Sequence, residues 1–217
     1  MKILVTDINT EISSILKNGL NDHEVEISEG VDSDNLSDFD CVIIQSMADN
    51  CDTPEDLNQK IQKTYNTLSS CVEAGVKKVI MISTLSLMKN YKESYTVTEK
   101  WKSTPSTQLD ILSSHLSEVI FKEFARTFSF QKILLRIGFP INNSETETPE
   151  TKSALSKTEL INSINKIIDL NFNEKYEIIH IQNKSESQRF LTNKFEDLSN
   201  LIGEQEQAFY TPIERKS

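Results

Sequence analysis

Two kinds of hydrophobic pattern alternate along this chain of 217 residues. Short, unbroken apolar runs are typical of strands that are buried on both faces of a sheet, and they occur at 2–6, 41–44, 78–83 and 131–136. Two further strands are predicted at 23–27, where polar and apolar residues alternate, and at 176–181. Apolar residues spaced three and four apart predict helices at 12–20, 54–75, 109–127, 160–168 and 195–202.

This succession of buried strands and amphipathic helices predicts an α/β protein with a Rossmann-like, doubly wound parallel sheet. We expect five or six strands, with Ile3 to Val5 at the centre of the sheet. The polar segment 142–157 has no apolar period and is expected to be a connection. It separates a Rossmann-like, NAD(P)-binding-type domain, 1–141, from a reduced C-terminal lobe with a short strand and helix, 158–217, that packs on the same domain.

The two long helices each carry an apolar stripe that is expected to face the sheet. In the helix at 54–75 this stripe consists of Leu57, Ile61, Tyr65, Leu68 and Val72. In the helix at 109–127 it consists of Leu109, Leu112, Leu116, Val119 and Ile120. A second flank of the latter helix could meet a partner helix, and its residues are Ile111, His115 and Phe121.

The chain is acidic, because 33 aspartates and glutamates outnumber 23 lysines and arginines and give a formal net charge of −10. Its longest basic cluster is Lys77-Lys78, so we expect no nucleic acid and no anionic membrane as a partner. The apolar start, Ile3 to Val5, is too short for a signal peptide, and no later run approaches about 18 apolar residues. We therefore expect a cytoplasmic protein.

The cysteines and histidines, three of each, are too scattered to predict a disulfide framework or a zinc site. Cys41 and Cys71 are expected to be inert thiols of the core. The carboxylates that flank Cys51 should raise its pKa rather than activate it. His180, within an apolar strand, is expected to be a core histidine whose hydrogen bonds are satisfied. We expect no metal.

Several phrases spread through the chain carry a resemblance. They are Met1–Thr6, Asp40–Ile44, Asn66–Thr84, Leu116–Arg126, Ile133–Arg136, Tyr176–Ile181 and Leu198–Gly203. Together, and in this order, they resemble the extended short-chain dehydrogenase/reductase family, which contains the NAD-dependent nucleotide-sugar epimerases and dehydratases. The resemblance implies a Rossmann fold. It also implies a homodimer, since in the family the helices that match 54–75 and 109–127 commonly pair across a two-fold axis.

The first turn departs from the family's motif, Thr-Gly-x-x-Gly-x-x-Gly, whose backbone amides bind the cofactor pyrophosphate at a helix N-terminus. The aligned positions here are Asp7, Thr10 and Ser13, with Asn9 or Thr10 as the expected N-cap. The whole chain holds only five glycines, about 2% against an ordinary share of roughly 7%. A carboxylate at residue 7 would repel a pyrophosphate. We expect no cofactor, or weak binding of NAD or NADP.

The family's catalytic tyrosine, and the lysine four residues after it, are also missing. Alignment on Glu118 places Asp110 at the tyrosine position and Ser114 at the lysine position, and Tyr-x-x-x-Lys occurs nowhere in the chain. Thr84 is the candidate remnant of the hydroxyl that assists the tyrosine, although a lone hydroxyl at a strand end is more often structural. Trp101 borders the family's substrate cleft and is a candidate contact for a ligand or partner, or else a cap over the core.

The chain is also shorter than the family pattern. Between the second strand and Cys41 there is no room for the family's third strand and helix, so the adenine side of the sheet should be trimmed. These departures predict a degenerate NAD(P)-binding-type Rossmann protein that is non-catalytic and has a binding or scaffolding role. The alternative is an atypical NAD(P)-dependent nucleotide-sugar epimerase or reductase whose catalytic groups have moved.

Overall fold

The computed structural model describes residues 1–8, 10–29, 33–47, 51–140, 153–172, 174–183 and 189–198. Its elements follow in the order β1 (Lys2–Thr6), α1 (Glu11–Gly19), β2 (Glu24–Ser28), α2 (Ser33–Leu36), β3 (Cys41–Gln45), α3 (Pro54–Glu73), β4 (Lys78–Thr84), the 3-10 helix η1 (Leu85–Met88), α4 (Leu109–Thr127), β5 (Gln131–Ile137), β6 (Phe139–Pro140), β7 (Ala154–Leu155), α5 (Lys157–Asp169) and β8 (Tyr176–Ile181). Residues 193–198 are also helical.

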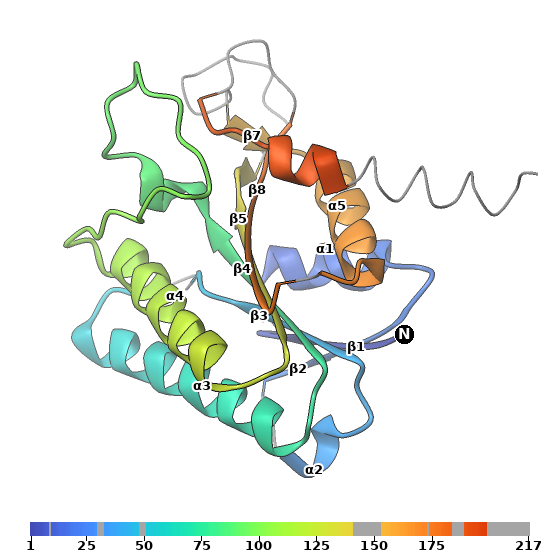
Figure 1. Ribbon diagram of the computed structural model, residues 1–217. Helices are drawn as coiled ribbons and strands as arrows, with labels where there is room; N and C mark the ends of the chain where they lie inside the picture. The colour runs from blue at the N-terminus through green and yellow to red at the C-terminus, as the bar shows by residue number, and fades with distance from the viewer. Residues whose placement is uncertain are drawn as a thin grey trace, which may run out of the picture.

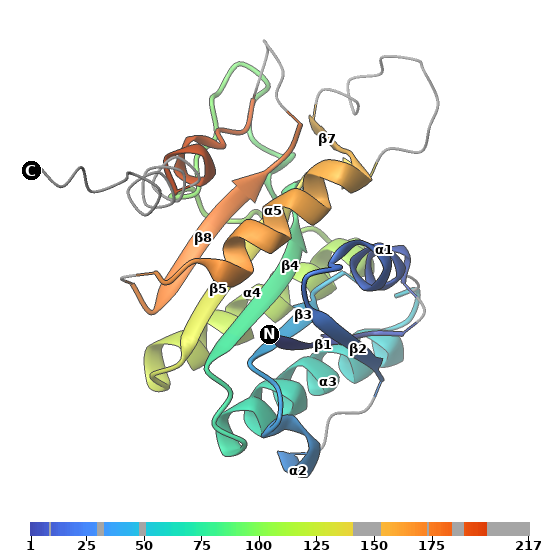
Figure 2. The ribbon, with the colours of Figure 1, turned by 90° about the vertical axis from the view of Figure 1, so that its right-hand side faces the viewer.

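Six strands form one parallel sheet in the order β2-β1-β3-β4-β5-β8 (Figures 1 and 2). From β1 the chain moves outward to β2, returns to β3 on the other side of β1, and continues to β8. This doubly wound sheet confirms the predicted fold class. The expected central position of Ile3 to Val5 is wrong: β1 lies one strand in from the edge, because in the described part of the chain no strand follows β2 on its outer side.

Helices cover both faces of the sheet in a three-layer arrangement (Figure 1). Successive residues of the central strands point to opposite faces, so each strand contributes to two cores. The core on the side of α1 and α5 includes Val5, Ile43, Ile82, Leu135 and Ile164. The core on the side of α2, α3 and α4 includes Leu4, Leu68, Met81, Phe121 and Leu134.

Helix α5 is held against both α1 and the sheet. Gly19 on α1 faces Ile161 so closely that a Cβ at residue 19 would overlap the isoleucine side chain. At the other end of α5, the buried Lys78 donates from Nζ to the carbonyls of Ile168 at 2.5 Å and Leu170 at 2.7 Å. These carbonyls lack partners within a helix, so the lysine satisfies them and fixes the C-terminal end of α5.

The buried face of α4 is not the stripe that the sequence predicted. Val119, assigned to the core, is 44% exposed, and Phe121, assigned to the outer flank, is 0% exposed. The residues that face inward are Ser113, Ser114, Ser117, Glu118, Phe121 and Phe124. Serine is small enough for a helix to approach its neighbours closely, and the Ser117 and Thr64 hydroxyls lie 3.3 Å apart between α4 and α3. The prediction failed because it followed the larger apolar side chains.

The apolar stripe predicted on α3 is also wrong at one residue, which was expected to face the sheet and instead lies on the surface. Tyr65 is 53% exposed, and its ring packs edge-on against Phe124 of α4 with ring centroids 5.4 Å apart. The fully buried residues of α3 are Thr64, Thr67, Leu68 and Cys71.

Strand β8, which follows the polar connection, belongs to the same sheet as β1, β2, β3, β4 and β5. Residues 141–152, most of the polar connection expected at 142–157, lie outside the described residues. After them, β7 pairs with β6 in a two-stranded parallel sheet, and α5 begins at Lys157. Strand β8, from the expected C-terminal lobe, pairs directly with β5.

The corrected orientation of α4 gives a stability prediction. Replacing Phe121 with alanine should lower the free energy of unfolding by about 3 to 5 kcal/mol, because it leaves a cavity between α4 and the sheet. Val119→Ala, two residues earlier on the outer surface, should change it by less than about 1 kcal/mol. Urea unfolding followed by circular dichroism measures both. Equal losses, or a larger loss for Val119→Ala, would restore the stripe predicted from sequence.

Candidate functional site

The candidate site lies at the carboxyl ends of β1 and β3. At this point the sheet reverses its winding, since β1 leads outward to β2 and β3 leads the other way to β4. Doubly wound sheets bind their ligands in the crevice at such a switch point. Here the turn from β1 into α1 meets the last residue of β3, Gln45, and the side chains of α3.

Asp7 occupies a backbone conformation that usually belongs to glycine. Its φ is 71°, and among the described residues it is the one non-glycine residue with a positive φ. Aspartate tolerates this left-handed region better than most residues but is still strained in it. The turn is held by Ser13, whose Oγ donates to the Asp7 carbonyl at 2.5 Å. Residue 7 therefore has a backbone conformation that favours glycine, together with a carboxylate side chain.

The Asp7 carboxylate is bound by two lysines of α3. Lys63 Nζ lies 2.6 Å from Oδ1 and Lys60 Nζ lies 3.5 Å from Oδ2, while the Thr6 hydroxyl donates to Oδ2 at 3.1 Å. Burial alone would raise the pKa of this carboxyl group, but Lys60 and the hydrogen bond from Lys63 outweigh burial and lower the pKa below its ordinary value of 3.8. The group is therefore an anion that the protein neutralises internally.

Gln45 fills the space between the first turn and β3. Its Nε2 donates to the Thr6 carbonyl at 3.0 Å and to Ser13 Oγ at 2.8 Å, and its Oε1 accepts from the Thr10 hydroxyl at 3.0 Å. Gln45 and Ser13 are both buried. Thr10 is the N-cap of α1, and its Oγ1 also accepts from the Ser13 amide at 3.0 Å. The other expected cap, Asn9, lies outside the described residues.

These residues do not fit a dinucleotide pyrophosphate. A pyrophosphate at this turn needs free backbone amides and positions without a Cβ. The positions that align with the three glycines of the family's motif carry Asp7, Thr10 and Ser13. The Ser13 amide already donates to the Thr10 hydroxyl. The two lysines that reach the turn are paired with the Asp7 carboxylate. A ligand phosphate would have to displace that carboxylate.

Thr84, the candidate remnant, and Asp110 and Ser114, which align with the family's tyrosine and lysine, make separate contacts. The Thr84 hydroxyl accepts from the Ser86 amide at 3.1 Å and caps η1. Asp110 is exposed in the first turn of α4. Ser114 is buried, with Oγ 3.4 Å from the carbonyl of Ser46. In the part of the chain that the structure describes, no hydrogen bond joins any two of Thr84, Asp110 and Ser114.

A buried ion pair lies next to these positions, and sequence reasoning missed it. Glu118 of α4 binds Arg136 of β5 through two contacts, Nη2 to Oε2 at 2.8 Å and Nε to Oε1 at 3.0 Å. Ser83 of β4 donates to Glu118 Oε1 at 2.7 Å. Both charged side chains are at most 5% exposed. A bidentate pair that is further hydrogen bonded offsets the cost of burying its charges, so it fixes α4 to two strands.

Trp101 is part of an aromatic cluster on the loop before α4. Its ring meets Tyr91 edge-on at 4.7 Å between centroids and lies 5.8 Å from the ring of Tyr95. Its carbonyl accepts from Arg136 Nη1 at 3.3 Å, which ties the loop to the buried ion pair. Leu85, Leu87, Met88, Val97 and Phe190 are buried and form a third, smaller core, against which the rings of Tyr91 and Trp101 pack.

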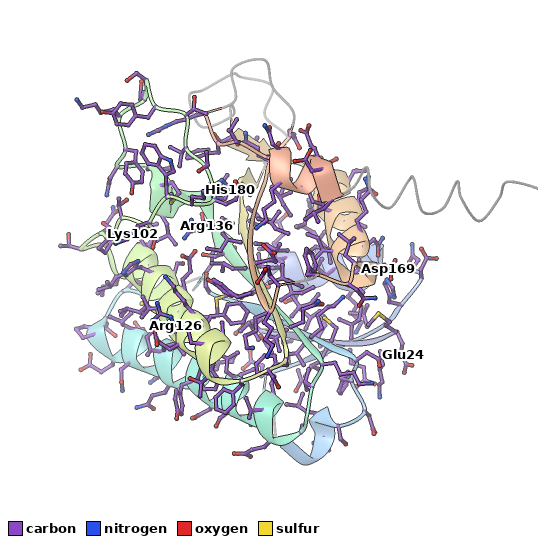
Figure 3. All side chains as sticks on the ribbon, viewed as in Figure 1. Glu24, Lys102, Arg126, Arg136, Asp169 and His180 are labelled. Atoms are coloured by element: carbon purple, nitrogen blue, oxygen red, sulfur yellow. The ribbon has the colours of Figure 1, made fainter. Side chains whose placement is uncertain are left out.

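His180 is a core residue, but its hydrogen bonds are not satisfied as the sequence predicted. It lies on β8 beside Arg136 of β5 (Figure 3) and is fully buried. The Leu191 backbone is near the ring, yet among the described residues neither ring nitrogen completes a hydrogen bond of ordinary geometry. Burial and the Arg136 charge lower the pKa of His180 to about 3.

A cavity of about 150 Å³ opens beside the first turn, between the N-terminal ends of α1 and α5. Its apolar lining consists of Ile12, Ile15, Met47, Ile137, Leu155 and Leu160. Gln45 and Thr10 form its polar wall, and Glu11 and Lys157 lie at its surface, where they form an ion pair of 2.9 Å. No sequence pattern predicted this cavity, because its walls come from four separate segments of the chain.

Cys41 and Cys71 lie in the core, as the sequence predicted. All three are free and buried, and burial raises the pKa of Cys41 and Cys71 to about 12. Burial, then Asp56, raises the pKa of Cys51. Across the described ranges, no three histidine, cysteine, aspartate or glutamate side chains are grouped so as to hold a metal ion. None of the described helices has the length and apolar character needed to cross a bilayer.

Comparison with known proteins finds solved structures with a similar fold. No protein-family model matches the sequence, and no curated protein matches it. Among solved structures, uronate dehydrogenase from Agrobacterium tumefaciens is similar over 100% of this chain and 91% of its own, with a TM-score of 0.77 and 12% identity. UDP-glucuronic acid 4-epimerase from Bacillus cereus, solved with NAD, is similar over 91% of this chain and 90% of its own, with a TM-score of 0.69 and 17% identity.

These neighbours are extended short-chain dehydrogenases/reductases of the NAD-dependent epimerase/dehydratase type. The fold therefore agrees with the resemblance that the sequence phrases carry. At such low identity the likeness concerns the fold. The chemistry of the site depends on the residues that this chain places there.

The buried His180 predicts how stability depends on pH. Its pKa is about 3 in the folded protein and about 6.5 when unfolded, so between these values the unfolded chain binds more protons. The free energy of unfolding should therefore fall as the pH drops from 6.5 to 4.5, with a contribution from His180 of up to about 1.4 kcal/mol per pH unit.

Urea unfolding at intervals across that range tests this pH dependence. His180→Gln should flatten the slope, and His115→Gln, the same change at a half-buried histidine that bonds Ser103, should leave it as it is. An unchanged slope in His180→Gln would mean that the ring is hydrated or protonated in the folded protein.

Proposed function

We propose that this chain is a degenerate, non-catalytic protein of the epimerase/dehydratase type that has a binding or scaffolding role. The observation that carries the proposal is the internal ion pair of the first turn. Asp7 presents a carboxylate where the cofactor phosphates of related proteins are expected, and Lys60 and Lys63 already neutralise it. A dinucleotide would have to break this pair and would then meet a like charge.

The former catalytic positions support the same proposal. The chain has no Tyr-x-x-x-Lys, and the groups that replace the pair are an exposed carboxylate, Asp110, and a buried hydroxyl, Ser114. Neither is a phenol whose pKa a neighbouring lysine lowers, which is the acid/base group of the family. The charged pair nearby, Glu118 and Arg136, is bound internally. A chain that keeps the fold and loses both the cofactor turn and the acid/base pair retains surfaces for binding.

Cofactor binding is tested by thermal unfolding of the wild type with NAD, NADH, NADP and NADPH. We expect no shift of Tm at millimolar cofactor. A ligand at 100 times its Kd would stabilise the fold by about 2.7 kcal/mol, which corresponds to roughly 5 to 10 °C for a domain of this size. A shift of that size in the wild type would overturn the proposal and favour the atypical epimerase or reductase.

Asp7→Gly should gain cofactor affinity, because it removes the carboxylate that would repel the cofactor phosphates and restores a residue suited to the left-handed turn. Asp7→Asn is the matched control. It also removes the charge but keeps a side chain in the turn, so its gain should be smaller than that of Asp7→Gly. If neither variant binds more tightly than the wild type, the Asp7 carboxylate is not what prevents binding.

We also propose a homodimer through α3 and α4, which lie side by side on one face of the molecule (Figure 2). Support comes from apolar side chains on their outer surface. Tyr65 of α3 and Val119 of α4 are about half exposed, and Leu112 and Leu116 of α4 are partly exposed. A second copy of the same surface would cover them, as two-fold interfaces do.

Sedimentation equilibrium at tens of micromolar protein tests the dimer. We expect a dimer for the wild type and a monomer for Val119→Asp, because the charge would be buried against its symmetry mate. Tyr95→Asp, an equally exposed position on the loop before α4, is the control and should stay dimeric. Phe121→Asp is unsuitable, since Phe121 is in the core. A monomeric wild type would overturn this proposal.

A further inference from the structure

The cavity beside the first turn has the size and lining of a site for a small apolar molecule. Its volume is about 150 Å³, and cavities of about this volume with aliphatic walls bind molecules such as benzene. Six apolar side chains from α1, the residues after β3, the end of β5, β7 and α5 line it, and they are Ile12, Ile15, Met47, Ile137, Leu155 and Leu160.

The polar groups of the wall are already bound within the protein. Gln45 uses Nε2 for Thr6 and Ser13 and Oε1 for Thr10. Ser156 Oγ accepts from the Glu159 amide at 3.2 Å as the N-cap of α5. The wall therefore presents few polar groups that a ligand could satisfy, and a polar ligand would lose hydrogen bonds to water without replacing them.

The charges at the surface of the cavity are also paired. Glu11 and Lys157 belong to the first turns of α1 and α5, and both are largely exposed. Because the pair balances its own charge, it provides no net attraction for an ionic ligand. An exposed ion pair is held only weakly, so the two side chains can separate to admit a molecule between the helices.

We propose that this cavity is a binding site for a small, uncharged apolar molecule about the size of a benzene ring. The proposal rests on the proposed function, since a dinucleotide in the adjoining turn would compete for the same edge of the sheet. A protein that keeps the fold of a dehydrogenase without its cofactor turn would thus bind a small apolar ligand. The alkyl or aryl group of the ligand lies between α1 and α5, and its contacts are with aliphatic side chains.

Methyl-resolved NMR of the full chain, titrated with benzene, tests the site. We expect saturable shifts at the methyl groups of Ile12, Ile15 and Ile137, and no shift at Ile61, which lies on α3 across the sheet. Ile15→Phe and Met47→Phe both place an aromatic ring in the cavity from a partly exposed position, and each should abolish the shifts. Val119→Phe adds the same ring to the outer surface of α4 and should leave the shifts intact.

Three results would overturn the inference. The first is the absence of saturable shifts in the wild type. The second is their persistence in both filled variants, each confirmed as folded by its thermal transition, because benzene would then bind elsewhere. The third is tighter binding of benzoate than of benzene at the same methyl groups, because the ligand class would then be anionic. A separate titration with NADH distinguishes the two proposals: saturable shifts with NADH overturn the proposed function, whereas the benzene result decides the apolar site.

Discussion

The structure depends on how its first turn reverses direction without a glycine. Residue 7 must adopt a left-handed backbone to lead β1 into α1, and an aspartate takes this conformation. The cost of that backbone, of order 1 to 3 kcal/mol, is offset by contacts that its side chain and carbonyl make. The carboxylate binds two lysines of α3, and the carbonyl accepts from Ser13 of α1. One strained residue thus joins a strand to helices on both faces of the sheet.

The same contacts determine what the carboxyl edge of the sheet can bind. With Asp7 neutralised by α3 and Gln45 bonded to Thr6, Thr10 and Ser13, the polar groups of the switch point are engaged with one another. The space that remains lies on the other side of the turn, between α1 and α5, and its walls are mainly aliphatic. The switch point therefore keeps a cavity, and the walls of this cavity have the composition of a hydrophobic core.

Much of the fold could be predicted from sequence because buried parallel strands are unbroken apolar runs. The position of β2 at the edge of the sheet is consistent with the short distance between β2 and Cys41. The buried face of α4 could not be predicted, since it is made largely of serines, which carry no hydrophobic signal. The site was found only in part. Asp7 was visible as a lost glycine, but its partner Lys63 is 56 residues away and Gln45 is 39 residues from Thr6, and only the fold brings them together.

The most direct test of this account is the ionisation of Asp7 itself. A pH titration of its side-chain carboxyl carbon by NMR, with and without NADH, measures the pKa of the group in the intact protein. We predict a pKa below 3.8 that NADH does not change, because Lys60 and Lys63 stay bound to the carboxylate. A pKa at or above 3.8 would show that the ion pair is not formed. A saturable change in the Asp7 resonance on addition of NADH would show that the turn still receives a dinucleotide.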